Sequence, residues 1–208
     1  MAIVDHVAQG TKAGLDATFG NPNSQVSAHF GVMRDGSIHQ YVEEEDSAWG
    51  AGILNQPDDT LPWLPQAGPA QGQRVNQWVI SIEHEGYSGE PLTPEQFRAT
   101  VMLHHVLIDK WAIPLDQDHI VGHYRLDSIN RRACPGAAFP WGELFQQLAV
   151  GAGSIVNDTE KTMDKERIQR ALDVVWGWSE RLEQLTAASA SKELKDAVVA
   201  IKEETKLQ

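Results

Sequence analysis

The sequence of 208 residues contains a single cysteine, Cys134, so no disulfide can form within the chain. No apolar run approaches the roughly 18 residues of a membrane-spanning helix. The first residues also lack the basic and apolar regions of a secretory signal peptide. We therefore expect a soluble protein without a membrane span or signal peptide, which would reach an extracellular target by another route.

Positive charge is also scarce, because 17 Lys and Arg stand against 29 Asp and Glu, for a formal net charge of -12. This balance argues against a protein that holds nucleic acid by neutralising its phosphates. Most of the excess acid lies before residue 157, so this part of the chain would be repelled by an anionic polymer at low salt. The hydrophobic fraction of 41% at this length allows one well-packed domain with a smaller appendage.

Two residue types that bind Zn²⁺ lie close together in the stretch HIVGHYRLDSINRRACPG, where Cys134 follows His123 by eleven positions. A catalytic zinc site needs three protein ligands and a fourth position that is open to water or substrate. The third candidate is His6, in the segment AIVDHVAQGT, which reads as a short strand that runs into a turn. The alternatives are a buried cysteine that acts as a small hydrophobic residue and histidines that are buried and hydrogen-bonded.

A carboxylate suited to acid-base chemistry is expected on the segment QWVISIEHEG, whose alternation predicts a strand. Glu83 and Glu85 lie on one face of this strand, and Trp78, Ile80 and Ile82 on the other. A carboxylate at the end of a central strand could take a proton from zinc-activated water. Either glutamate could instead be a solvated surface acid.

The clearest helix is expected from Thr93 to Trp111. Thr93 supplies an N-cap, Pro94 fits the first helical position, and Gln96 completes a capping box. Residues at helical spacing predict one buried face, on which the histidine is expected to be structural. This face consists of Phe97, Val101, His104, Ile108 and Trp111.

Shorter elements are expected around this helix. They are a short helix within 12–25, a hairpin over 26–42 around Asp35-Gly36, a strand in 118–123 and a closing helix in 139–148. Residues 55–76 contain four prolines and form a long loop. Leu61, Trp63 and Leu64 in this loop would either cover a groove as a lid or pack on the domain surface.

Four segments of the chain occur in the order seen in a known family. They are AIVDHVA, SAHFGVMRDGSIHQYV with DSAWGAG, NQWVISIEHEG, and GHYRLDSINRRACPG, within the range Ala2 to Leu148. In these segments the chain resembles the zinc-dependent N-acetylmuramoyl-L-alanine amidases of type 2, which are related to T7 lysozyme and the peptidoglycan recognition proteins and include phage endolysins. The resemblance implies an α/β fold with a central mixed β-sheet flanked by helices.

The resemblance also implies a chemistry. His6, His123 and Cys134 match the zinc ligands, and Glu83 matches the catalytic glutamate. Such an enzyme cleaves the amide between N-acetylmuramic acid and L-alanine in bacterial peptidoglycan, and as a phage endolysin it would move from the host cytoplasm to the cell wall. Two alternatives stay open: a non-catalytic peptidoglycan-binding module of the same fold, and a zinc hydrolase that acts on a different amide.

Further positions match the family only in part. Arg132 lies where the family often has a lysine and could stabilise an oxyanion, although Arg131 could fill this role instead. Trp49 could form a wall for substrate, and His29 matches a frequent histidine of the hairpin, which could contact substrate or be buried within the fold. Gly50 is a departure, because the family usually has a histidine there.

The sequence suggests three parts: a catalytic domain in 1–150, a linker in 151–158 and a helical region in 159–208. Gly151 to Ser154 reads as a hinge. Two apolar stripes in the last part predict a C-terminal helical hairpin with too little apolar surface to be stable alone. This hairpin would dock on the catalytic domain, bind wall material or form a homo-oligomer with another copy.

Overall fold

The structure is a computed structural model, and it describes residues 1–52, 54–64 and 75–154. In this part of the chain, no helix is long and apolar enough to cross a membrane. The helical hairpin expected in 159–208 and the end of the linker lie outside the described residues, so the division into domains and the homo-oligomer stay predictions.

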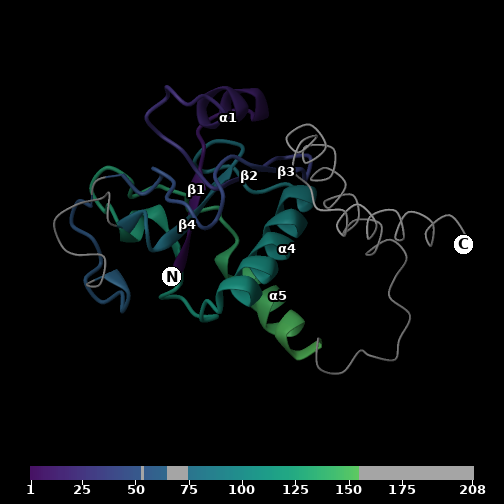
Figure 1. Ribbon diagram of the computed structural model, residues 1–208. Coiled ribbons are helices and arrows are strands. Elements are labelled where there is room, and N and C mark those ends of the chain that lie inside the picture. The colour runs from purple at the N-terminus through teal and green to yellow at the C-terminus, as the bar shows by residue number, and fades with distance from the viewer. Residues whose placement is uncertain (53, 65–74, 155–208) are drawn as a thin grey trace, which may run out of the picture. The chain divides into compact units, whose positions relative to one another are not determined.

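A mixed five-stranded sheet forms the centre of the described residues, which confirms the expected fold (Figure 1). Its strands are β1 (Ala2–Val7), β2 (Phe30–Val32), β3 (Ile38–Gln40), β4 (Val79–His84) and β5 (Ile120–Gly122), in the order β3-β2-β4-β1-β5. β1 runs parallel to β4 and β5, β2 runs parallel to β4, and β3 pairs antiparallel with β2. The hairpin turns at the expected Asp35-Gly36 pair, where Gly36 has a φ of +86° that residues with a side chain rarely adopt.

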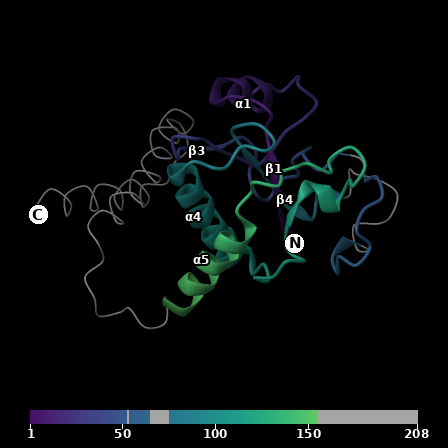
Figure 2. The same cartoon turned by 180° about the vertical axis from the view of Figure 1, so that it is seen from behind.

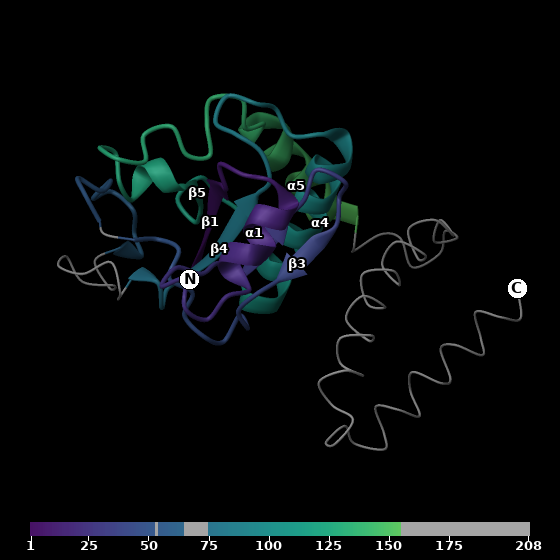
Figure 3. The same cartoon turned by 90° about the horizontal axis from the view of Figure 1, so that it is seen from above.

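The helices with defined bounds are α1 (Lys12–Phe19), α4 (Pro94–Trp111), the 3-10 helix η1 (His123–Arg125) and α5 (Trp141–Ser154). α4 and α5 lie side by side on one face of the sheet (Figures 1 and 3). α5 continues to Ser154, so the whole segment from Gly151 to Ser154 is helical and the prediction of a hinge there is wrong.

The two faces of the sheet are covered differently, because alternate strand residues point to opposite sides. Ile3, Ile80 and Ile82 pack under α4 and α5. Ala2, Val4, Val79 and Val121 pack under Leu61, Trp63 and Leu64 of the long loop. The packing alternative is therefore confirmed for these loop residues. The prediction for Trp78 is wrong, because this residue precedes β4 and packs with Val79 rather than with Ile80 and Ile82.

The start of α4 differs in one detail from the expected capping box. The Thr93 hydroxyl accepts the Gln96 N–H at 3.1 Å, as expected of an N-cap. The Gln96 side chain does not return to the cap and instead donates to the carbonyl oxygens of Val32 and Glu85, both at 2.9 Å. Gln96 thus ties the helix start to the end of β2 and to the residue after β4.

The buried face of α4 is rotated from the apolar stripe that the sequence predicts. The buried residues are Gln96, Ala99, Thr100, Leu103, His104 and Leu107. Phe97, Val101, Ile108 and Trp111 are only partly buried at its sides. The difference arises because three polar residues of the helix are buried and hydrogen-bonded, which a pattern of apolar residues does not reveal.

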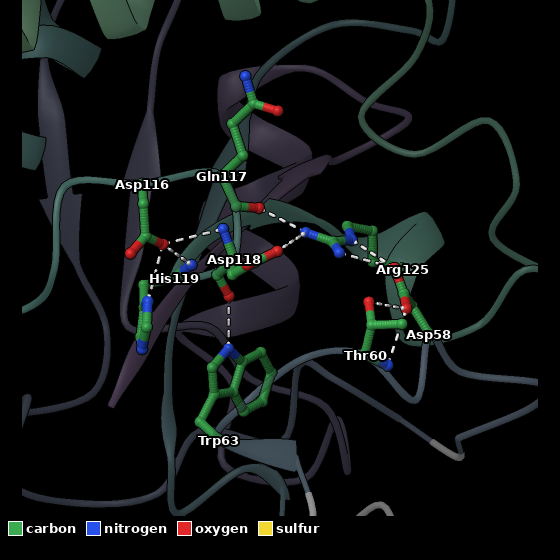
Figure 4. A network of polar contacts seen from close by, with 8 residues as sticks. All are labelled: Asp58, Thr60, Trp63, Asp116, Gln117, Asp118, His119 and Arg125. Carbon is green, nitrogen blue, oxygen red and sulfur yellow. Dashed lines mark hydrogen bonds and ion pairs between the residues drawn. The ribbon is translucent and has the colours of Figure 1, made fainter.

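A polar network fastens the long loop to the residues on both sides of β5 (Figure 4). Figure 2 shows the backbone of the described residues from behind. The Arg125 guanidinium donates to Asp58 Oδ2 from two nitrogens, at 2.9 and 2.7 Å. It also donates to Asp118 Oδ1 at 3.0 Å and to the Gln117 carbonyl oxygen. The Trp63 indole N–H donates to the Asp118 carbonyl oxygen at 2.6 Å. Since Arg125 ends η1, the loop is tied to the segment that carries one candidate ligand.

Candidate metal centre

The three expected ligands converge at the carboxyl-terminal edge of the parallel strands. His6 lies near the end of β1, His123 begins η1 directly after β5, and Cys134 follows in the next loop. Their potential ligand atoms all lie within 4.8 Å of one another, and the Nδ1 atoms of the two histidines are 2.9 Å apart. Across the described ranges, no fourth His, Cys, Asp or Glu joins this group.

The orientation of His123 is set by a backbone carbonyl. Its Nε2 lies 3.0 Å from the carbonyl oxygen of Ala51, which can only accept, so Nε2 carries the proton. Nδ1 therefore keeps its lone pair on the side of His6, as a metal-binding imidazole requires. The Ala51 N–H in turn donates to Asn76 Oδ1 at 3.0 Å. Asn76 is a supporting residue that no motif or periodicity in the sequence singles out.

Burial controls the protonation of the three donors. It lowers the pKa of His6 well below its ordinary value and that of His123 to about 4. Both imidazoles are therefore neutral near pH 7 and able to bind a metal ion. Burial raises the pKa of the Cys134 thiol to about 12, so the thiolate forms there only if a cation stabilises it.

This donor set fits a zinc ion. Neutral imidazole and thiolate are ligands that Zn²⁺ prefers, and three protein donors leave a position for water or substrate. His6 Nε2 is buried and has no hydrogen-bond partner among the described residues, so this ring is not held by the interior in the way an ordinary buried histidine is. Within the described ranges, the Cys134 sulfur accepts only the Val7 N–H, at 3.4 Å.

Glu83 lies directly beside His6, because the two residues are Cα partners on the adjacent parallel strands β4 and β1. Their side chains therefore leave the same face of the sheet. Glu83 Oε2 is buried without a hydrogen-bond partner among the described residues. Burial raises the pKa of this carboxyl to about 7, partly offset by the positive charge of Arg131. A carboxyl with this pKa can both accept and donate a proton near neutral pH.

Glu85, the other carboxylate considered from the sequence, is used within the fold. Its Oε1 accepts the Lys12 N–H at 2.7 Å, at the first residue of α1. Its Oε2 accepts the Arg34 N–H at 2.8 Å, at the turn of the hairpin. Both oxygens are therefore committed, which favours Glu83 for acid-base chemistry.

The two candidate arginines differ in their relation to the site. The charge of Arg131 acts on the pKa values of all three potential ligands and of Glu83. The Arg132 side chain is exposed and makes no hydrogen bond or ion pair with another described residue. Arg131 is exposed as well, so only its charge effect on the site favours it, the alternative, over the family position Arg132. The catalytic role of either stays a prediction.

His29 lies in the interior, with only 1% of its surface exposed. Its Nδ1 accepts the Ser81 N–H at 2.9 Å, so Nε2 carries the proton and donates to the Asp46 carbonyl oxygen at 3.2 Å. Both ring nitrogens thus hold the start of the loop 46–52 against β4. This arrangement supports the structural alternative for His29 and gives no support to contact with substrate.

Trp49 and Gly50 lie in the loop that delivers the Ala51 carbonyl. Trp49 is 54% exposed, as a residue that meets substrate must be. A β-carbon at Gly50 would lie 2.7 Å from Ser81 Oγ, closer than real β-carbons approach, and 3.1 Å from the Ser27 carbonyl oxygen, which is also tight. A histidine at this position therefore does not fit against β4 as it stands, which gives the departure from the family pattern a packing reason.

Asp127 organises the loop that brings Cys134 back to the site. Its carboxylate accepts the N–H groups of Ile129 and Asn130, at 3.1 and 2.7 Å. Its carbonyl oxygen accepts the Arg131 N–H, and the Arg131 carbonyl accepts the Cys134 N–H. Asp, Ser and Asn are residues that turns favour, and this is the signal by which the loop could have been recognised.

Two neutral imidazoles, one thiol and a neighbouring carboxyl that titrates near pH 7 form the kind of site that mononuclear zinc hydrolases use. The match to known families agrees with this class. The chain belongs to the N-acetylmuramoyl-L-alanine amidase family Amidase_2, whose family model matches residues 1–137.

Among proteins of similar sequence, the 1,6-anhydro-N-acetylmuramyl-L-alanine amidase AmpD of Haemophilus influenzae is 34% identical over 118 residues, or 56% of this chain and 55% of that protein. The AmpD protein of Salmonella typhimurium is 33% identical, and the match covers 60% of its length. The N-acetylmuramoyl-L-alanine amidase A of Achromobacter lyticus is 27% identical over 74% of this chain and 85% of that protein. The chain thus spans somewhat over half of the AmpD proteins.

Solved structures show the same fold. The crystal structure of a selenomethionine derivative of AmpD has a TM-score of 0.54 at 26% identity, and the match covers 71% of this chain and 83% of that one. AmpDh3 from Pseudomonas aeruginosa has a TM-score of 0.55 at 21% identity, over 70% of this chain and 58% of that one.

Proposed function

We propose that this chain hydrolyses the amide bond between N-acetylmuramic acid and L-alanine in peptidoglycan, with a zinc ion held by His6, His123 and Cys134. The observation that carries the proposal is the convergence of these three donors within 4.8 Å, beside the carboxyl of Glu83. The family description and the names of the relatives supply the substrate class.

The residues of the site have distinct roles in this proposal. When bound, the zinc ion supplies a water molecule whose pKa is lowered to about 7 and polarises the amide carbonyl. Glu83 accepts a proton from the attacking water at Oε2 and later donates it to the nitrogen of L-alanine. The positive charge of Arg131, or of Arg132 as the family position suggests, stabilises the oxyanion. Trp49 provides an exposed aromatic surface for the sugar or peptide.

A non-catalytic wall-binding module would need the fold but not this donor set. Such a module has no use for three metal-binding side chains brought together from three segments. It also has no use for a buried carboxyl without a hydrogen-bond partner, which is unfavourable unless it serves chemistry. These features favour the enzyme over the module.

The test measures the release of new L-alanine amino groups from purified peptidoglycan by the full chain. We expect release to require zinc, to stop when a chelator is added and to return when Zn²⁺ is restored. Cys134→Ala should be inactive at every zinc concentration. Release that survives both the chelator and Cys134→Ala would remove the zinc mechanism.

The form of the substrate can be decided in the same assay. The AmpD relatives, at 30 to 34% identity, are named for a 1,6-anhydro-N-acetylmuramyl substrate, which favours a soluble anhydro-muropeptide as a second candidate. Intact peptidoglycan, soluble muropeptides with and without the 1,6-anhydro ring, and an unrelated N-acyl-L-alanine should be compared at equal amide concentration. Cleavage of the last compound alone would indicate a zinc hydrolase for a different amide.

A further inference from the structure

Asp5 is a fully buried carboxylate on the face of β1 opposite to His6. In the described part of the chain, no lysine or arginine pairs with it. Its Oδ2 lies 3.2 Å from Nε2 of His104 on α4, and its Oδ1 lies 3.8 Å from Nε2 of His84 on β4. Oδ1 has no hydrogen-bond partner among the described residues, so the contact with His104 is the one that holds this buried side chain.

His104 contacts the Asp5 side chain from α4. Its Nδ1 lies 2.8 Å from the Thr100 carbonyl oxygen, which can only accept, and its Nε2 faces the Asp5 carboxylate. A protonated His104 would donate from both nitrogens to these two partners. Burial lowers the pKa of His104, but the charge and hydrogen bonds of its partners raise it by more. The buried contact between Asp5 and His104 therefore joins β1 to α4.

His84 connects this pair to the backbone of a ligand. Its Nδ1–H donates to the His6 carbonyl oxygen at 2.9 Å, and its Nε2 lies 3.1 Å from the Thr100 hydroxyl. Its ring also meets the ring of Phe139 edge-on, with 5.1 Å between centroids. One imidazole thus touches the peptide group of His6 and a residue five positions beyond Cys134.

We propose that Asp5, His84 and His104 are positioning residues that orient His6 for metal binding from the reverse face of the sheet. Adjacent strand residues leave opposite faces, so fixing the Asp5 side chain against α4 fixes the direction in which His6 leaves β1. The bond from His84 to the His6 carbonyl restrains the same peptide against rotation. The inference rests on the proposed function, because it assigns this buried network a purpose in the metal site.

The test is metal binding by the full-length, metal-free protein. Co²⁺ is titrated and followed by visible absorption, which reports a histidine and thiolate ligand set, and Zn²⁺ affinity is measured by competition with a chromogenic chelator. Asp5→Asn retains the shape of the side chain and removes its charge. We expect it to weaken both affinities roughly 10- to 100-fold, in the range known for groups that orient metal ligands, and to shift the absorption bands at saturation.

A matched control separates positioning from general stability. Leu103 is buried on the same face of α4, with 6% exposure and no polar contact with β1. Leu103→Ala should lower the unfolding temperature and leave both affinities unchanged. Thr100→Val, which removes the hydroxyl that contacts His84, is a milder second variant. If Asp5→Asn does not fold, the metal affinities and unfolding temperature of Thr100→Val are compared with those of Leu103→Ala instead.

The outcomes distinguish this inference from the proposed function. If Asp5→Asn lowers the unfolding temperature but keeps wild-type affinity and absorption, the network only holds α4 in place and the proposal is overturned. A wild-type chain that binds neither ion overturns the metal site and the positioning role together. A wild-type chain that binds both ions but cleaves no peptidoglycan overturns only the substrate, while weaker binding by Asp5→Asn still supports the positioning role.

Discussion

The buried carboxyl of Glu83 should make the metal-free protein less stable as the pH rises. Its pKa in the folded chain is about 7, above the ordinary value of 4.5, so the folded state binds this proton more tightly than the unfolded state does. The corresponding stability is complete below about pH 4.5 and is lost as the pH rises through about 7. We expect the free energy of unfolding of the wild type to fall by on the order of 2–3 kcal/mol over this pH range, and Glu83→Gln to remove this fall.

Chemical denaturation of the metal-free wild type and of Glu83→Gln at several pH values checks this expectation. The same variant should retain bound zinc and lose amidase turnover by about 100-fold or more, since it can no longer take a proton from water. Equal pH dependence of stability in the two proteins would mean that Glu83 does not titrate in this range. Loss of zinc from the variant would assign Glu83 to the ligands.

A second prediction at this scale concerns Gly50. Gly50→Ala places a methyl group 2.7 Å from Ser81 Oγ, so it should destabilise the protein by roughly 1–3 kcal/mol. Ser81→Gly removes both Ser81 atoms in this contact, and the double variant should recover most of the loss. Thermal unfolding of the two single variants and the double variant measures the coupling. Purely additive effects would show that the two residues do not meet as described.

The three candidate ligands could be named from the sequence because Cys134 is the single cysteine and because the family resemblance singles out His6 and His123 among eight histidines. The groups that orient these ligands could not be found in this way, because their types occur throughout any protein. They are the Ala51 carbonyl, the Asn76 amide and the Asp5 carboxylate. Residue type also fails to rank neighbours such as Arg131 and Arg132, since the turn of the backbone decides which charge acts on the site.

At the scale of elements, the ion pair between Arg125 and Asp58 should control how firmly the long loop is held to η1. The Thr60 hydroxyl and the Arg125 guanidinium hold the pKa of Asp58 at about 2. The stabilisation is therefore present above the ordinary value of 3.8 and is lost only as the pH falls through about 2. Both side chains are partly exposed, so we expect Asp58→Asn to cost only about 1 kcal/mol.

Hydrogen exchange localises this effect. The N–H of Asp58 donates to the Arg125 carbonyl and that of Ser128 to the Asn55 carbonyl, so both amides should exchange faster in Asp58→Asn. The exposed pair Glu95 and Arg98 on α4 offers a matched control, and Arg98→Gln should leave these two amides unchanged. Unchanged exchange in Asp58→Asn would mean that the apolar packing of the loop holds it without the ion pair.

The elements themselves followed from local signals where such signals were strong. Thr93 and Pro94 begin α4 as expected, and Asp35-Gly36 turns the hairpin. The rotation of α4 could not be predicted, because Gln96 and Thr100 are buried against hydrogen-bond partners at the ends of β2 and β4. Such long-range hydrogen bonds leave no periodic pattern in a sequence. The contacts that hold the long loop could not be predicted for the same reason.

At the scale of the whole molecule, the net charge of -12 predicts how the rate of wall hydrolysis depends on salt. Both the protein and an anionic wall polymer carry negative charge, so their approach is unfavourable at low ionic strength. At 0.1 M salt the screening length is about 10 Å, which removes most of this repulsion. The rate on anionic cell walls should therefore rise several-fold between roughly 10 and 150 mM salt.

A small neutral muropeptide feels little of the repulsion and serves as the control, since its cleavage rate should stay constant. A wall rate that falls as salt is added would show instead that attractive charge contacts at the site dominate the approach, against the balance of the whole chain.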